Sequence, residues 1–293
     1  MIVKQLGNDN DNMNQQGNLY VVATPIGNRN DITLRAIKIF EKVDLVAAED
    51  TRHTGKLFEF HKIKSRFVSY HQHNEIKRTP ELIQKLNQGI SIALVSNAGT
   101  PSVSDPGYRL IKEAAKSGVR VIPIPGVSAV TTALSAAGMP TDSYVFAGFL
   151  AKKKVKRLKQ LKELADEKRT IVFYESPRRI EVLLENILDL MGNRYGVLCR
   201  EMTKLHEEFL RGNLSEIYAG LKKRIQVKGE CTLLVSGCLD DERVSINDLR
   251  FEIRQRLKNT DSRLSELVKD ISRQFGISKN KVYAEALKIK ETI

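Results

Sequence analysis

Residues 96–107, with the sequence SNAGTPSVSDPG, have the composition of a ligand-binding loop. They follow an apolar run, residues 90–95, which predicts a buried strand. The two glycines and two prolines of the loop exclude a regular helix or a central strand. A strand that ends in such a loop indicates the carboxyl edge of a parallel sheet, where open α/β folds bind small molecules. We therefore expect main-chain atoms of this loop to contact a ligand directly, although an ordinary strand-to-helix connection uses similar residues.

Further loops of this kind follow other apolar runs. They are TPIGN at residues 24–28, AEDTR at 48–52, HNE at 73–75, PGVSA at 125–129 and YESPRR at 174–179. Small residues and main-chain groups outnumber strong acids and bases in them. Such loops suit a flat neutral group and a zwitterion held by main-chain contacts. They favour group transfer from a cofactor that carries its own activated group, so that the protein mainly positions the reactants.

Several common functional motifs do not occur in the sequence. No GxGxxG follows a strand, and no GxxxxGK[ST], HExxH or GxSxG is found. His71 and His73 could share one face of an extended segment, but no cysteine lies near them, so we expect no metal site. The three cysteines form no CxxC pair, which argues against disulfides and indicates a reducing, cytoplasmic location.

The formal net charge of +13 favours an acidic partner, although a lysine-rich composition alone could produce it. Lysine and arginine are dense in residues 152–162, at the start of an expected helix. Such a group can neutralise phosphates of a nucleic acid, or it can simply be a solvated helix face. The basic residues concerned are Lys152, Lys153, Lys154, Lys156, Arg157, Lys159 and Lys162.

Alternating strands and helices predict an α/β fold built from two α/β domains and a small helical domain. Residues 1–17 are rich in Asn, Gln and Asp and are expected to be a disordered leader without a signal peptide. Residues 18–127 should form a mostly parallel sheet, and residues 128–240 a mixed one. Residues 241–293 should form two helices joined by a Gly turn, similar to a helix-turn-helix, or a helical cap. No apolar run is long enough to cross a bilayer.

The expected elements follow from apolar periodicity and helix caps. Expected strands are residues 19–23, 43–48, 66–70, 90–95, 119–124, 144–149, 170–174, 196–200, 207–211 and 231–236. The first expected helix begins at Asp31 or Thr33. Further helices are expected at residues 79–87, 108–117, 128–138, 154–165, 178–191 and 214–223. Two more helices are expected at about residues 264–275 and after Ser278.

At the strand-end loops the chain resembles the tetrapyrrole-methylase-like class III methyltransferases, which use S-adenosylmethionine. Within them it looks like the bacterial enzymes that make a 2′-O-methylcytidine in 16S rRNA of the small ribosomal subunit. The matching segments are, in order, LYVVATPIGN, DIT, VDLVAAEDTRHTGKL, HQHNE, ALVSNAGTPSVSDPG, PIPGVSAVTTAL, FAGFL, TIVFYESPRR, CREMTKLHEEFLRGNL and KGE. The resemblance covers residues 19 to about 237, and a helical C-terminal extension is typical of the family.

The resemblance implies two α/β domains with the cofactor, S-adenosylmethionine, in the cleft between them, and a homodimer. It also implies positions for cofactor contacts, which are Pro25, Ala98, Gly99, Thr100, Val103, Ser128, Ala129 and Gly212. Two residues depart from the family pattern. Asn97 replaces an Asp, which removes a charge but keeps turn hydrogen bonds, and Arg178 replaces a His, which weakens the case for a histidine base there.

Methyl transfer to a ribose 2′-hydroxyl needs an oxygen held near the methyl group and an acceptor for its proton. Glu49 and Glu175 are our candidates, with Asp50, His73 and Glu75 as weaker ones. The expected phosphate contacts are Arg52, Lys152, Lys153, Lys154, Arg157 and Arg179, with Lys204 as a further basic candidate. Two alternatives remain open, a small-molecule methyltransferase acting on tetrapyrroles and a non-enzymatic nucleic-acid-binding protein.

Overall fold

The computed structural model describes residues 16–238, 246–259, 264–275, 277 and 279–290. Most of the predicted leader, residues 1–15, and the predicted Gly276 turn with Ser278 lie outside this part of the chain. The chain divides into two compact units, Met1–Ser128 and Ala129–Ile293, called unit 1 and unit 2 below. At the end of the predicted leader, the Gly17 N–H donates to the Leu86 carbonyl (2.7 Å).

Unit 1 alternates strands and helices along the chain. Its elements are β1 (Leu19–Val22), the 3-10 helix η1 (Arg29–Asp31), α1 (Leu34–Lys42), β2 (Leu45–Ala48), α2 (Thr51–Phe60), β3 (Phe67–Ser69), α3 (Glu75–Asn87), β4 (Ile92–Val95), α4 (Tyr108–Lys116) and β5 (Val121–Ile124). The sheet order is β3-β2-β4-β1-β5, and every pairing is parallel. All four residues of β4 are buried, as expected for a central strand covered on both faces.

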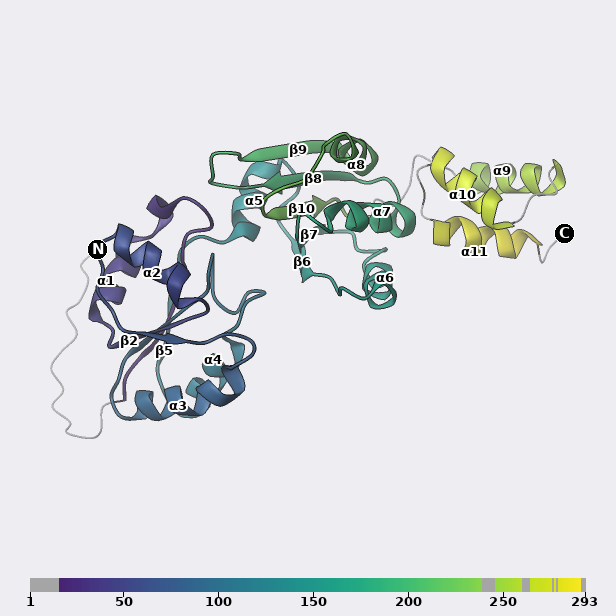
Figure 1. The fold of residues 1–293 in the computed structure, drawn as a ribbon. Coiled ribbons are helices and arrows are strands. Elements are labelled where there is room, and N and C mark those ends of the chain that lie inside the picture. The colour runs from purple at the N-terminus through teal and green to yellow at the C-terminus, as the bar shows by residue number, and fades with distance from the viewer. Residues whose placement is uncertain (1–15, 239–245, 260–263, 276, 278, 291–293) are drawn as a thin grey trace, which may run out of the picture. The chain divides into compact units, whose positions relative to one another are not determined.

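Two hydrophobic layers cover the sheet of unit 1. On one side Phe40 of α1 and Phe58 of α2 pack against the strands, with ring centroids 4.7 Å apart. On the other side Leu82 of α3 and Leu110 of α4 complete a second core. Figure 1 shows α1 and α2 on one face of the sheet and α3 on the other. Because parallel strands point the same way, this packing brings the loops after β1, β2, β4 and β5 to one edge.

Unit 2 contains a mixed sheet. Its elements are α5 (Ala129–Ala137), β6 (Tyr144–Phe149), α6 (Lys154–Glu163), β7 (Thr170–Glu175), α7 (Ile180–Met191), β8 (Tyr195–Arg200), β9 (Glu208–Asn213), α8 (Leu214–Lys222) and β10 (Cys231–Val235). The order is β6-β7-β10-β8-β9, where only the β6–β7 pairing is parallel. Helices α6, α7 and α8 pack on one face. Arg211 of β9 donates to the Ala136 carbonyl of α5 (2.7 Å), which fixes α5 against the sheet.

Three helices follow at the C-terminal end, α9 (Ile246–Asn259), α10 (Leu264–Phe275) and α11 (Lys279–Lys290). They share a core of their own, in which Ile253, Ile271 and Val282 are fully buried. Two of these helices were expected from the sequence, and α9 was not. None of the helices in the described residues is long and apolar enough to cross a membrane.

The predicted fold class is confirmed, and most predicted strands agree with the structure to within two residues. Two elements of unit 1 differ from the sequence interpretation. Helix α2 was not predicted, since its first two residues were assigned to the loop at residues 48–52 and the rest to no element. Helix α3 begins at Glu75 rather than at Thr79. Pro80 therefore lies inside the helix and not in its first turn. The Thr79 hydroxyl donates to the Glu75 carbonyl (2.7 Å), which stabilises this early turn.

Candidate functional site

The loop after β4 is fastened to the end of β1 by paired backbone hydrogen bonds. The Thr24 N–H donates to the Gly99 carbonyl, and the Gly99 N–H donates to the Thr24 carbonyl, both at 2.9 Å. The buried Thr24 hydroxyl also donates to the Ser96 carbonyl (3.2 Å). Gly99 has φ +73°, a conformation that other residues adopt only with strain. This bridge holds the main chain of Ala98–Gly99–Thr100 in one fixed conformation.

Glu49, at the end of β2, holds the same loop from the other side. Its Oε2 accepts the backbone N–H of Asn97 (3.1 Å), and its own N–H donates to the Val95 carbonyl. The side-chain oxygen Oδ1 of Asn97 is buried and has no hydrogen-bond partner among the described residues. The loop therefore carries an unused buried acceptor next to a glutamate that fixes its backbone.

Asp105 is a functional candidate that the sequence analysis did not select. Burial raises the pKa of its carboxyl to about 6, and the neighbouring charge of Glu49 acts in the same direction, while a hydrogen bond with the Ser96 side chain opposes both. The carboxyl group of Glu49, which follows β2, and that of Asp105, near the end of the loop, are thus close enough to interact. A carboxyl group that titrates near neutral pH can accept or donate a proton under physiological conditions.

The same loop contains unusual backbone conformations. Ser102 and Ser104 both have φ +66°, in the left-handed region that costs a non-glycine residue free energy. At Gly107 (φ +143°) a Cβ would lie 3.0 Å from Leu94 Cδ2. Strain of this kind is concentrated in loops whose geometry is set by function. The loop thus has the rigidity expected of a ligand contact.

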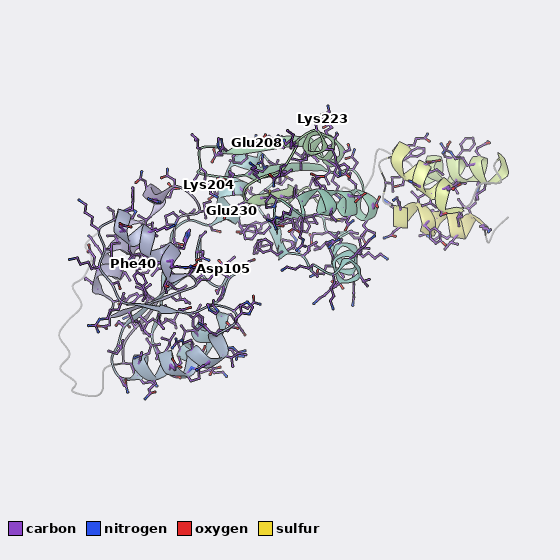
Figure 2. All side chains as sticks on the ribbon, in the orientation of Figure 1. Phe40, Asp105, Lys204, Glu208, Lys223 and Glu230 are labelled. Atoms are coloured by element: carbon purple, nitrogen blue, oxygen red, sulfur yellow. The ribbon has the colours of Figure 1, made fainter. Side chains whose placement is uncertain are left out.

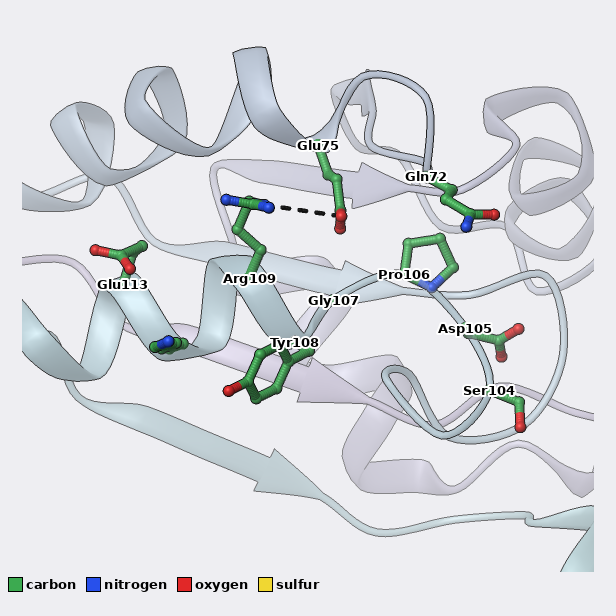
Figure 3. Close-up of a pocket in the computed structure, with 10 residues that line it drawn as sticks. Gln72, Glu75, Ser104, Asp105, Pro106, Gly107, Tyr108, Arg109 and Glu113 are labelled. Carbon is green, nitrogen blue, oxygen red and sulfur yellow. Dashed lines mark ion pairs between the residues drawn. The ribbon is translucent and has the colours of Figure 1, made fainter. Parts of the chain in front are cut away.

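A hollow of about 340 Å³ lies in unit 1 between the starts of α3 and α4. Glu75 and Arg109 approach each other across it, with 3.7 Å between Oε1 and Nε (Figure 3). The residues that line it are Gln72, Glu75, Ser104, Asp105, Pro106, Gly107, Tyr108, Arg109, Lys112 and Glu113. The hollow therefore begins where the strained loop ends.

The other predicted residues of unit 1 lie in different settings. Asp50 is the N-cap of α2, and backbone hydrogen bonds, chiefly from the Arg52 N–H, lower the pKa of its carboxyl. The Arg52 side chain itself is 90% exposed, as a phosphate contact must be. Pro25 is buried beside the Thr24–Gly99 bridge, and Val103 is 37% exposed on the loop. Thr100 donates to the Val127 carbonyl (3.2 Å), one residue before Ser128, which ends unit 1.

In unit 2, Glu175 at the end of β7 is only 3% exposed. Its Oε1 accepts the Ser176 N–H (2.8 Å), and its Oε2 lies 3.0 Å from an Arg179 guanidinium nitrogen. The same nitrogen of Arg179 donates to the Leu150 carbonyl (3.0 Å). Arg179 is therefore engaged within unit 2, where it links the ends of β6 and β7. Glu175 is thus paired with a cationic side chain, whereas the contact described for Glu49 is with the backbone N–H of Asn97.

The basic segment of α6 contains two kinds of residue. Lys152, Lys153 and Lys154 are exposed, and no acidic partner lies beside them in the described part of the chain. Arg157 differs, because it is 7% exposed and donates to Asn186 Oδ1 (3.0 Å) and to the Lys152 carbonyl (3.0 Å). The prediction that Arg157 contacts a phosphate is corrected by this burial. Arg157 holds the turn that displays the three lysines.

The hairpin that joins β8 and β9 holds Lys204 in an ion-pair network. Lys204 Nζ lies 2.9 Å from Glu201 Oε1 and 3.0 Å from Glu230 Oε2. Figure 2 labels Lys204 and Glu230 in unit 2. Its hydrogen bond lowers the pKa of the Glu201 carboxyl. The charge of Lys204 is thus compensated locally, which argues against its use as a phosphate contact.

Gly212 and Ala129 are positions where the resemblance implies cofactor contacts in unit 2. Ala129 begins α5. Gly212 has φ +147°, and a Cβ there would lie 2.6 Å from Glu216 Oε2. Glu216 is the capping glutamate of α8 and accepts the Asn213 N–H (2.8 Å). The backbone conformation favours glycine here, and a larger residue would also displace the Glu216 carboxylate that caps α8.

The family of the chain follows from its comparison with known proteins. A family model described as Tetrapyrrole (Corrin/Porphyrin) Methylases matches residues 18–218, which include strands β1 to β9. The chain belongs to this family. It is 43% identical over 274 residues to ribosomal RNA small subunit methyltransferase I of Halalkalibacterium halodurans, covering 92% of this chain and 94% of that protein. The protein of the same name from Pasteurella multocida is 42% identical over 276 residues, covering 94% and 98%.

Solved structures share the fold at lower sequence identity. A uroporphyrin-III C-methyl transferase from Thermus thermophilus, solved in complex with S-adenyl homocysteine, has a TM-score of 0.52 and 16% identity. It covers 75% of this chain and 97% of its own. This likeness confirms the fold, in which helices pack on two β-sheets. The relatives named above place the chain among the ribosomal RNA small subunit methyltransferase I proteins of the family.

Proposed function

We propose that this protein transfers a methyl group from S-adenosylmethionine to the ribose 2′-oxygen of a cytidine in 16S rRNA of the small ribosomal subunit. The observation that carries the proposal is the identity of 43% with a relative named for this rRNA, which extends over 92% of the chain. The strand-end loops of unit 1 and the exposed lysines at the start of α6 supply the corresponding chemistry.

The residues of unit 1 fit S-adenosylmethionine. The backbone of Ala98–Gly99–Thr100 is held rigid by the bridge to Thr24, and the Asn97 amide oxygen beside it is buried without a donor. The carboxyl groups of Glu49 and Asp105 suit a cofactor that carries a positive sulfonium. We propose that Pro25 and Val103 complete this side, and that Ser128, Ala129 and Gly212 supply further contacts. When bound, the cofactor supplies an electrophilic methyl group.

We propose that Glu49 accepts the proton of the 2′-hydroxyl as the new carbon–oxygen bond forms. One oxygen of Glu49 holds the Asn97 N–H, and the carboxylate lies close enough to Asp105 to raise its pKa. Glu175 is the weaker candidate, because it is 3% exposed and paired with Arg179. Its proposed role is to hold Arg179 in place. Glu49→Gln should therefore reduce kcat much more than it weakens cofactor binding.

Methylation of small subunits from a strain that lacks this enzyme tests the function directly. Purified full-length protein, S-adenosylmethionine with a labelled methyl group, and either small subunits or free 16S rRNA are incubated. The RNA is then digested for mass spectrometry. Labelled 2′-O-methylcytidine supports the proposal, and a base-methylated or unlabelled RNA contradicts it. The small-subunit arm also shows whether an assembled particle is the substrate.

Two further measurements separate the alternatives. Calorimetric binding of S-adenosylmethionine excludes a non-enzymatic nucleic-acid-binding protein, while salt-dependent binding to 16S rRNA excludes a tetrapyrrole enzyme. Cys199, Cys231 and Cys238 form no disulfide among the described residues, which suits the cytoplasmic location that we propose. Light scattering of the purified chain tests the homodimer that we propose from the resemblance.

A further inference from the structure

The hollow between α3 and α4 has the size and lining of a small-molecule site. Its volume of about 340 Å³ lies within the range of ligand pockets. One wall is the end of the strained loop, Ser104 and Asp105, and another is the first turn of α4. The loop that carries the proposed cofactor backbone, Ala98–Gly99–Thr100, therefore continues directly into this hollow.

Tyr108 gives the hollow an aromatic surface. It is the first residue of α4 and is 68% exposed, which is unusual for a ring that could pack on a core. The Lys112 Nζ lies 5.8 Å from its ring centroid and adds a positive charge beside it. An exposed ring next to a cation suits a nucleotide, because bases stack on aromatic side chains and phosphates pair with lysine.

The polar lining favours one kind of base. Glu75 and Asp105 present carboxyl oxygens, which accept hydrogen bonds, and Gln72 adds an amide. Glu75 stays 23% exposed despite its long ion pair with Arg109. Carboxylates accept from the exocyclic amine of cytosine, whereas they repel the exocyclic carbonyl of uracil at the same place. The lining thus selects a base with an exocyclic amine.

We propose that this hollow binds the base of the target cytidine, with Tyr108 stacked on the ring and Glu75 accepting its exocyclic amine. The proposal rests on the proposed function, because it assigns the base-reading part of the same site. A base bound in this hollow must leave its stack, which costs least for a nucleotide that is already single-stranded. Arg109 and Lys112 are then placed to pair with the adjacent phosphates.

The stacking role is tested by Tyr108→Ala, Tyr108→Phe and the control Tyr195→Ala, which truncates a 43% exposed tyrosine of unit 2. With small subunits as substrate, Tyr108→Ala should lower kcat/KM about tenfold or more, since stacking on one aromatic ring contributes that much. Tyr108→Phe should keep most activity because the ring remains. Cofactor affinity by calorimetry should stay within about twofold in all three. Equal rates for Tyr108→Ala and Tyr195→Ala would overturn the proposal.

The base-reading role is tested by Glu75→Gln on two RNAs, one with cytidine and one with uridine at the target. The glutamine amide can donate to the exocyclic oxygen of uracil, so the preference for cytidine should fall severalfold. An unchanged preference contradicts the assignment of Glu75. The variant also removes the ion pair with Arg109, so its folding is checked by circular dichroism.

Binding of cytidine monophosphate separates this proposal from the proposed function. Ligand-observed NMR on the unmodified full-length protein should detect cytidine monophosphate more strongly than uridine monophosphate, with the signal lost in Tyr108→Ala. If no 2′-O-methylcytidine forms yet this Tyr108-dependent binding is seen, the proposed function fails and the pocket stands. If methylation occurs but neither the rate nor nucleotide binding depends on Tyr108, the pocket fails and the function stands. If both methylation and nucleotide binding are absent, both fail.

Discussion

Replacing Asp105 with asparagine should stabilise the protein at neutral pH and not at acid pH. The carboxyl pKa is 3.8 for an ordinary aspartate and about 6 in the folded protein, because burial and the charge of Glu49 both oppose ionisation. The folded state therefore holds the proton more tightly than the unfolded state. As the pH rises from about 4 to about 6, the unfolded chain ionises first and the free energy of unfolding falls. Above about pH 6 the loss is complete and constant.

The size of this loss follows from the shift. At 1.36 kcal/mol per pKa unit, full ionisation costs roughly 3 kcal/mol, and the partial solvent access of Asp105 reduces this to roughly 1–2 kcal/mol. Asparagine has the same shape and no charge, so Asp105→Asn removes the cost. The variant should therefore melt about 5 °C above the wild type at pH 7.5. About half of this gap should remain at pH 5, because the unfolded carboxyl is already ionised there.

Differential scanning calorimetry of the full chain at several pH values measures this gap. Asp142→Asn, at an exposed position of unit 2, is the matched control and should show no such pH dependence. In a Glu49→Gln background the gap from Asp105→Asn should shrink, because one cause of the raised pKa has been removed. A gap that stays constant from pH 5 to pH 7.5 would refute the reasoning, since packing rather than ionisation would then explain it.

Four further outcomes follow from the contacts described above. Alanine at all three of residues 152–154 should weaken 16S rRNA binding and reduce its salt dependence by about two counterions, measured by filter binding, without changing the melting temperature. Arg157→Ala should leave the salt dependence of rRNA binding unchanged. It should lower the free energy of unfolding, measured by calorimetry, by about 2–4 kcal/mol, because it leaves buried acceptors unpaired. Gly212→Ala should cost about 1–3 kcal/mol, since its Cβ would meet the capping glutamate of α8. Asn97→Asp should change the methylation rate less than about threefold while lowering stability above pH 6, because it adds a buried carboxyl at a residue held by Glu49; a large gain in rate would instead assign a chemical role to that charge.

The sheets could be predicted because their apolar runs are short and sharply bounded. Residues 90–95 and 231–236 contain almost only apolar residues and end at Gly, Pro or polar residues, and both became central strands, β4 and β10. The crowded strands of the second half correctly indicated a mixed sheet. Such patterns are local, so a single sequence suffices to read them.

The missed helices have physical reasons. In α2 the residues after Asp50 are mostly polar, and only Thr54 and Phe58 are buried, so the apolar period is weak. In α9 the inward-facing residues Leu249, Ile253 and Leu257 supply only one apolar residue per turn, and the apolar Phe251 between them is exposed, so the apolar face is narrow. In α3 the proline favoured a first-turn position that the structure does not use.

The candidate site was predictable as a set of loops and not as a set of side-chain roles. Composition identified the loop at residues 96–107, because glycine and proline restrict the backbone locally. The role of Asp105 depends on its closeness to Glu49, which comes from β2, so only the fold brings the two together. The burial of Arg157 likewise depends on Asn186 of α7, far along the chain. Long-range pairing of this kind leaves no trace in the local pattern.

The backbone of the loop at residues 96–107 links these observations. Serine has no special tolerance for positive φ, yet Ser102 and Ser104 both adopt φ +66° within three residues. Each such residue costs roughly 1 kcal/mol, which the paired bonds between Thr24 and Gly99 and the hydrogen bond to Glu49 can offset. The strained conformations turn the chain so that Asp105 lies near Glu49 and α4 begins with Tyr108 at the hollow. A relaxed loop of the same composition would not bring a titratable carboxyl and an aromatic ring to one place.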